Sequence, residues 1–484
     1  MHGEIAESSY TQEITNLVKR IVNRSSLQTS LYEQASHYFQ HYQTNKENLE
    51  KLSLSVQASQ TALAQGNFTN RQKLSTELEA AQALLLQEQQ KQKQEKQKRY
   101  DSLYHTSESL VLLSEASDQQ ETLTNSAKLL GTLLLLSPHE GSKLAIQHQK
   151  LKPVYKAVLA LRLLDKLLVD NHIATNYILQ KQALGQRYSA TGLQLSQFQH
   201  DVCIPIVIAA LIQDIGLQHP QAQHILKGEN GDLDEFRVLK NEERLSLLKI
   251  NYQQTLDYLV HGIGLGNYNG NSKEEKSQFD TTEIHRQKFI TILLNDSIKP
   301  KQVEGHLLKI PQIYASVIFS TKPDPSLANL PKATLVLEKA AEIKSISAQY
   351  TKSFIQMVGH FPQGFGVTYI PKDDDGHDLD RYEYAIVCAL NPKNSFAPIC
   401  RTATRHLTFN SAGKMLVVPV SNNLYFATTR KKFAKISPNR LNEILSQLCS
   451  NFEERKNLEL IPSHWNPYTY FGYKKFQNLW KKAN

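Results

Sequence analysis

The residues around Gln213-Asp214 form a candidate metal-hydrolase site. Asp214 ends the apolar run CIPIVIAALIQD, so its carboxylate would stand at the end of a buried helix. Hydrolysis on metal ions needs several imidazole and carboxylate ligands that converge on the cations and activate a water molecule. Asp214 supplies one such carboxylate, and its neighbour Gln213 is a neutral amide.

The part of the chain that would position these residues is helical between Pro153 and about Phe361. Apolar residues recur there at spacings of three and four, as in VYKAVLALRLLDKLLVDNHI and NEERLSLLKINYQQTLDYLV. After Phe361 the pattern changes to short apolar runs bounded by Gly, Asp, Asn and Pro, which predict the strands of a small β cap. These runs cover 364–370, 384–388 and 415–419.

Three motifs, taken in order along the chain, resemble the HD-GYP branch of the HD phosphohydrolases. The first is the IQDIG step with LKNEE opening the next helix, the second is IYAS leading to a TKP turn, and the third is FIQMVGHFPQGFGVTYIP. The resemblance covers roughly residues 153–400. It implies an HD-type helical bundle in a bacterial family whose active members are metal-dependent phosphodiesterases that hydrolyse cyclic di-GMP with iron or manganese.

The sequence departs from the family pattern at most of its ligand positions. Gln213 replaces the histidine of the HD step, and the next family histidine falls on Asn251. The metal-binding Asp that should precede Ile313 is Gln312, and the GYP tripeptide is absent. Asp214 is the family ligand that remains.

The family's paired histidines would fall near Glu283-Ile284, and the Glu and Arg that follow them near His285-Arg286. His285 is the only imidazole in this stretch. The resemblance thus implies a site without catalytic residues and without a metal cofactor. Its vestigial positions would be Gln213, Asp214, Asn251, Glu283, Ile284, His285, Arg286 and Gln312. The alternative is that this register is wrong and that the ligands lie elsewhere among the 17 histidines.

The stretch from about Thr11 to Tyr104 predicts long helices, because it is nearly free of Gly and Pro and rich in Gln, Glu, Lys and Leu. Apolar residues form two heptad-like runs, which are separated by Gly66-Asn67-Phe68-Thr69-Asn70. The pattern allows either an antiparallel hairpin or one long coil. The apolar stripe that the two runs form would pack within the chain or form a homodimer interface. The runs contain Leu49, Leu52, Val56 and Leu63, then Leu74, Leu78, Ala81 and Leu85.

The C-terminal region is basic and aromatic. From Arg430 onward the sequence contains eleven Lys or Arg and four Glu, so this region carries about +7 of the net charge of +9. Ser437-Pro438 predicts a helix that continues to about Glu454. In the closing stretch HWNPYTYFGYKKFQNLWKK, the aromatic residues are expected to dock the tail onto the body, with a partner or membrane contact as the alternative.

Other motifs carry less chemistry. Gly262-Ile263-Gly264-Leu265-Gly266 follows a helical pattern and lacks the third-glycine spacing, which argues against a dinucleotide fold and favours a flexible loop. Asp373-Asp374-Asp375-Gly376 begins like a calcium loop but lacks the closing Glu, so an exposed turn is expected. The four cysteines include no CxxC pair, which excludes a Cys-based zinc site.

Composition predicts a cytoplasmic protein with no transmembrane segment. The start, MHGEIAESSY, lacks the basic and apolar regions of a secretory signal, and the apolar run 202–212 is too short to span a bilayer. No recognition motif accompanies the basic tail, so no specific nucleic-acid partner is expected.

The fold expected is mainly α, with an HD-type bundle preceded by a coiled-coil-like helical region and followed by a small β cap and a C-terminal helix. Its length of 484 residues predicts two or three domains. The ranges expected are 1–105 for the hairpin or coiled-coil-like region, 106–150 for a helical connector, 151–365 for the HD-GYP-like domain, 366–430 for the β cap and 431–484 for the basic helix and aromatic tail.

The function expected is that of a non-catalytic signalling or regulatory protein. It would act through a protein partner and bind no cofactor, with cyclic di-GMP as a possible ligand and a homodimer possible through the N-terminal helices. One alternative is a divergent cyclic di-GMP phosphodiesterase that uses a reduced metal set centred on Asp214. Another is a dimerising scaffold in which the N-terminal helices are the main functional part.

Overall fold

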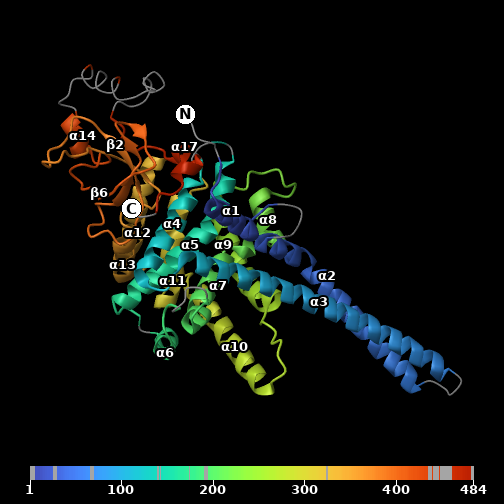
Figure 1. Cartoon of the computed structure of the whole chain (residues 1–484). Helices are drawn as coiled ribbons and strands as arrows, with labels where there is room; N and C mark the ends of the chain where they lie inside the picture. Colours follow the sequence, from blue (N-terminus) through green and yellow to red (C-terminus); the bar gives the residue numbers. More distant parts are fainter. Residues whose placement is uncertain are drawn as a thin grey trace. The chain divides into compact units, whose positions relative to one another are not determined.

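The computed structural model describes residues 6–24, 30–65, 70–138, 141, 143–173, 175–189, 194–322, 325–433, 439, 446 and 461–480. These residues are mainly helical, with a small antiparallel sheet near the C-terminus (Figure 1). The predicted mainly helical class with a β cap is therefore confirmed. The chain divides into two compact units, of which the first comprises 1–19, 107–211 and 289–484 and the second 20–106 and 212–288. The five expected domain ranges stay a prediction, because each unit combines segments from several of them.

The core of the first unit is built around α5 (Leu144–Val169), whose residues are buried on nearly every side. Residues 153–165 are all buried, as expected of a helix in the middle of a core, and α5 packs against α4, α11 and α13. Tyr155 of α5 stacks on Tyr314, with ring centroids 6.5 Å apart. The helices that lie wholly or mostly in this unit are α1 (Ser9–Ile21), α4 (Gln119–Leu135), α5, α6 (Asn176–Leu184), α7 (Ile204–Ile212), α11 (Val303–Ile318), α12 (Ala333–Glu342), α13 (Ala348–Val358), α14 (Ala427–Phe433) and α17 (Tyr468–Phe471).

A buried network of ion pairs lies inside this core. The Glu115 carboxylate accepts hydrogen bonds from Arg162 at 2.5 Å, from Arg187 at 2.6 and 2.9 Å, and from Gln199 at 2.7 Å. Asp165 accepts a further hydrogen bond from Arg187 Nε at 2.7 Å and forms an ion pair with Arg162 at 3.0 Å. Because two carboxylates face two guanidinium groups, the buried charges compensate one another. The network joins α5 to segments far away in the sequence.

The sheet of the β cap has the strand order β1-β2-β3-β6, and all neighbouring strands are antiparallel. The predicted runs 364–370, 384–388 and 415–419 coincide with β1, β2 and β6, whereas β3 was not predicted. The strands are β1 (Gly366–Tyr369), β2 (Glu383–Val387), β3 (Ile399–Thr402) and β6 (Met415–Val417), with β4 (Thr404–Arg405) and β5 (Thr408–Phe409) forming a separate hairpin.

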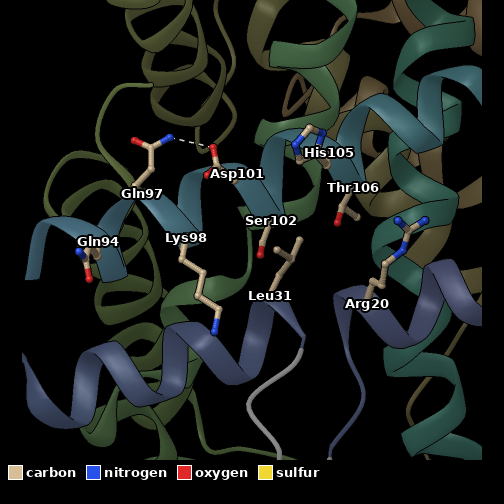
Figure 2. Close-up of a pocket in the computed structure, with 9 residues that line it drawn as sticks. All are labelled: Arg20, Leu31, Gln94, Gln97, Lys98, Asp101, Ser102, His105 and Thr106. Atoms are coloured by element: carbon tan, nitrogen blue, oxygen red, sulfur yellow. Dashed lines mark hydrogen bonds between the residues drawn. The ribbon is translucent and has the colours of Figure 1, made fainter. Parts of the chain in front are cut away.

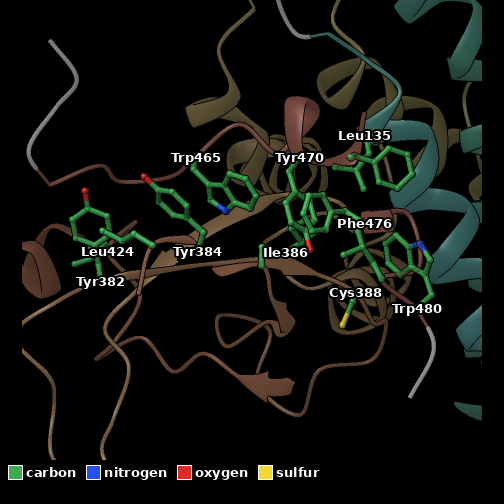
Figure 3. Close-up of a cluster of buried hydrophobic side chains, with 14 of the residues drawn as sticks. Leu135, Tyr382, Tyr384, Ile386, Cys388, Leu424, Trp465, Tyr470, Phe476 and Trp480 are labelled. Atoms are coloured by element: carbon green, nitrogen blue, oxygen red, sulfur yellow. The ribbon is translucent and has the colours of Figure 1, made fainter. Parts of the chain in front are cut away.

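The aromatic tail docks onto this sheet (Figure 3). Trp465 stacks on Tyr384 of β2 at 4.8 Å between centroids, and its Nε1 donates a hydrogen bond to the Ala385 carbonyl at 2.9 Å. Tyr470 stacks on Phe476 at 4.3 Å. The expectation that the aromatics dock onto the body is confirmed for residues 461–480. Most of the helix predicted from Ser437 to Glu454 lies outside the described residues.

The second unit begins with a long helical hairpin, formed by α2 (Leu31–Gln65) and the greater part of α3 (Arg71–Ser114) (Figure 1). Gln92 donates a hydrogen bond to the Asn45 carbonyl at 3.3 Å, and the Arg99 guanidinium lies 5.0 Å from the Tyr38 ring. The two helices are therefore antiparallel, and the same register places the buried Val56 opposite the buried Ala81. The heptad-like stripe thus packs within the chain, as one of the two alternatives predicted. The turn predicted at 66–70 lies outside the described residues, except for Asn70.

The rest of the second unit begins at Ile212, the last residue of α7. It consists of η2 (Ile215–Gln218), α8 (Pro220–Lys227), α9 (Asn241–Asp257), the π-helical turn η3 (Tyr258–Ile263) and most of α10 (Lys273–Asp296).

Within the described ranges, the stretch Gln199–Gln218 is long and apolar enough to cross a membrane, and 83% of its most apolar 18-residue segment is buried inside the protein. Core helices of soluble proteins meet the same criteria.

Candidate functional site

Gln213 and Asp214 lie between α7 and η2, as the apolar run predicted. Gln213 is buried and Asp214 is half-buried. The pKa of Tyr32, at the start of α2, is raised well above its usual value by burial and, to a smaller extent, by the negative charge of Asp214. The Asp214 carboxylate therefore lies close enough to the Tyr32 phenol for its charge to contribute to the raised pKa of that group.

Asn251 forms a structural contact at the position where the resemblance to HD-GYP domains predicted a replaced histidine. Its Nδ2 donates a hydrogen bond to the Gln213 carbonyl at 3.2 Å. One turn later on α9, the Thr255 hydroxyl accepts a hydrogen bond from the Gly216 backbone N–H at 3.1 Å. The structure thus brings Gln213 and Asn251 together, and their contact holds α9 against the turn after α7.

Gly216 makes this close approach possible. A Cβ at this position would lie 2.2 Å from the Asn251 carbonyl oxygen, which is far inside van der Waals contact. Glycine allows two backbones to pack at such a distance because it has no side chain. The glycine of the Asp-Ile-Gly step therefore has a packing role in this chain.

Glu283 and Arg286 form a second structural cluster in α10. Glu283 is 4% exposed. It accepts hydrogen bonds from the Tyr100 hydroxyl at 2.6 Å, from the Gly266 N–H at 3.1 Å and from Arg286 at 2.9 Å. The carboxylate at a predicted ligand position thus anchors α3 and the loop after η3 to α10. Burial raises the pKa of Tyr100 most, and the charge of Glu283 and its hydrogen bond raise it further. The phenol therefore keeps its proton and remains a hydrogen-bond donor.

The other predicted positions do not join these clusters. Ile284 is 43% exposed, and His285 is exposed as well. Gln312 is half-buried in α11, which belongs to the first unit. The one imidazole predicted near the site therefore lies on a solvent-facing side of α10.

The glycine-rich segment 262–266 comprises the last two residues of η3 and the start of the loop that follows, and α3 contacts the carbonyls at this point. Lys96 donates to the Val260 carbonyl at 3.1 Å, and Arg99 donates to the Gly262 carbonyl at 2.7 Å. Cations suit the carbonyls at the end of a helix, where the partial charge is negative. The charged stretch of α3 thus makes specific contacts.

The Glu283→Ala variant is expected to lose about 1–3 kcal/mol of unfolding free energy, because the Tyr100 hydroxyl and the Gly266 N–H would lose their buried acceptor. Urea unfolding followed by circular dichroism measures the loss. Ile284→Ala is the matched control, and a change at an exposed neighbour should stay within about 0.5 kcal/mol. Equal losses in the two variants would contradict the structural role of Glu283.

Two groups of side chains outside these clusters consist of residue types that can bind a metal ion. Asp373, Asp375 and His377 place one ligand atom each within 4.8 Å of one another on an exposed turn, and they are the one such group of three found in the part of the chain that the structure describes. The turn is exposed, as predicted. Sequence reasoning missed His37 and His41 of α2, whose four-residue spacing was the available signal and whose ring centroids lie 4.3 Å apart.

Comparisons of the chain with protein-family models, with curated proteins and with solved structures find no match.

Proposed function

We propose that this protein is a non-catalytic signalling or regulatory protein, with a degenerate HD-GYP-like domain that works through protein contacts in the cytoplasm. The resemblance of residues 153–400 supports the family, and the lost ligands support the absence of catalysis. The pathway proposed is linked to cyclic di-GMP, because that is the substrate of the active members.

The observation that carries this proposal is the engagement of polar groups at the former ligand positions. Asn251 donates to a backbone carbonyl, and Glu283 accepts from three donors within its own unit. A metal ligand must instead direct its lone pairs to a shared cation. These groups therefore support the fold in place of a metal centre.

Turnover measurements test this proposal against the divergent phosphodiesterase. Wild type and Asp214→Ala are incubated with cyclic di-GMP and added manganese or iron. We expect neither protein to hydrolyse the nucleotide above the rate in buffer, because Asp214 alone supplies too few ligands for a water-activating centre. Wild-type turnover that disappears in Asp214→Ala would establish the enzyme instead. A calorimetric titration with cyclic di-GMP separates a nucleotide-binding regulator from one that acts through protein contacts alone.

A scaffold role for the hairpin is the second candidate. Leu54, Leu84 and Leu86 are each more than half exposed on α2 and α3, and exposed leucines of this kind could form a homodimer contact. Light scattering of a variant with all three leucines replaced by glutamine tests this idea. A dimer that becomes a monomer supports the scaffold, and an unchanged mass refutes it.

A further inference from the structure

Helix α3 presents a second set of polar side chains, on the face opposite to the one that contacts the glycine-rich segment. Gln94, Lys98, Asp101 and His105 follow one another at intervals of three and four residues, which places them on one face of the helix. Lys96, Arg99 and Tyr100 point to the other face, where they contact residues 260–283. One helix thus carries two separate clusters.

The second face borders a cavity of about 520 Å³, within the range of roughly 300–1,000 Å³ that is typical of small-molecule sites. Figure 2 shows α3 above the start of α2 and the end of α1, with Leu31 and Arg20 completing the lining. All the lining residues belong to the second unit. The cavity is therefore bounded by three helices, which suits a small molecule better than a flat surface would.

The charges around the cavity favour an anion. Arg20 and Lys98 are cationic, and Asp101 is the one carboxylate in the lining. Guanidinium and ammonium groups are the side chains that bind phosphate in proteins. Hydroxyl and amide groups that can hydrogen-bond to the remainder of a ligand complete the lining, namely Ser102, Thr106, Gln94 and Gln97.

We propose that this cavity binds a small, soluble phosphate ester, of the size of a mononucleotide or a sugar phosphate. Arg20 and Lys98 would hold the phosphate group. The Asp101 carboxylate, which already accepts a hydrogen bond from Gln97 at 2.7 Å, would accept another from a hydroxyl or amino group of the ligand. The site is independent of the vestigial positions and of the function proposed for them.

Calorimetric titration of the full chain with inorganic pyrophosphate and with adenosine monophosphate tests this site. Lys98→Ala is expected to weaken the binding of both probes about tenfold, as the loss of one charge-assisted phosphate contact does. Asp101→Asn is expected to strengthen pyrophosphate binding, because it removes a repulsive charge. Lys93→Ala, an exposed lysine of the same helix outside the cavity, is the control and should bind like wild type.

Affinity that falls as salt is raised would further support a charge-based site. Circular dichroism checks that each variant is folded, and all three substituted side chains are exposed. Absence of saturable binding by wild type would overturn the proposal. Equal affinities of Lys98→Ala and Lys93→Ala would overturn it too, because any binding would then lie elsewhere.

Discussion

Arg162→Leu is expected to lose about 3–5 kcal/mol of unfolding free energy, the usual result of removing one partner from a buried ion pair. Arg162 is 1% exposed and pairs with both Glu115 and Asp165. Without its guanidinium, two buried carboxylates would share the single charge of Arg187. The measurement is urea unfolding, followed by circular dichroism.

The matched control for this change is Lys166→Leu on the same helix. Lys166 pairs with Asp170 across one helical turn, and both side chains are partly exposed, at 23% and 19%. Such a pair contributes about 0–1 kcal/mol, so the control should lose far less than Arg162→Leu. Similar losses in the two variants would show that the buried network does not stabilise the core as described.

Acid should weaken the same network. Burial alone would raise the pKa of Glu115, but the charges of Arg187 and Arg162 outweigh it and lower the pKa to about 2. A carboxyl whose pKa falls on folding stabilises the protein above its unfolded pKa of about 4.3. This stabilisation is lost between about pH 4.3 and 2, and the loss should be smaller in Glu115→Gln.

Gly216→Ala is expected to lose about 3 kcal/mol, the upper end of the usual overpacking cost. The new Cβ would lie 2.2 Å from the Asn251 carbonyl oxygen, and because both groups belong to the backbone, α9 would have to move away from the turn. Hydrogen exchange at the amides of α9 should therefore become faster, as should unfolding in urea.

Gly185→Ala provides the comparison. A Cβ at Gly185 would meet only Gln197 Cβ at 3.8 Å, which is ordinary contact, so its stability should change by less than about 1 kcal/mol. If Gly216→Ala were equally mild, the close contact between the Asp-Ile-Gly step and α9 would be wrong.

Local patterns predicted much of the fold. Spacings of three and four predicted the helices, and short apolar runs bounded by Gly and Pro predicted β1, β2 and β6. The heptad-like stripe corresponds to the packed face of the hairpin, where the buried Val56 lies opposite the buried Ala81. The strand β3 was missed because its four residues, ICRT, form neither a continuous apolar run nor an alternation of apolar and polar types.

Long-range polar contacts could not be predicted from spacing. Glu115 and Arg187 are 72 residues apart in the sequence, and Tyr100 and Glu283 are 183 apart. Arg162 and Asp165, which interrupt an apolar helix three residues apart, were the available signal for a buried ion pair. The contacts of Asn251 and Glu283, two of the positions that the resemblance singled out, likewise required the structure.

The metal content of the purified protein tests the central claim most directly. Protein prepared without chelators is analysed for iron and manganese by plasma mass spectrometry. Because Asn251 and Glu283 are engaged within the fold, we predict far less than one ion per chain, with the same value for wild type and Asp214→Ala. Near-stoichiometric iron or manganese that is lost in Asp214→Ala would contradict the account.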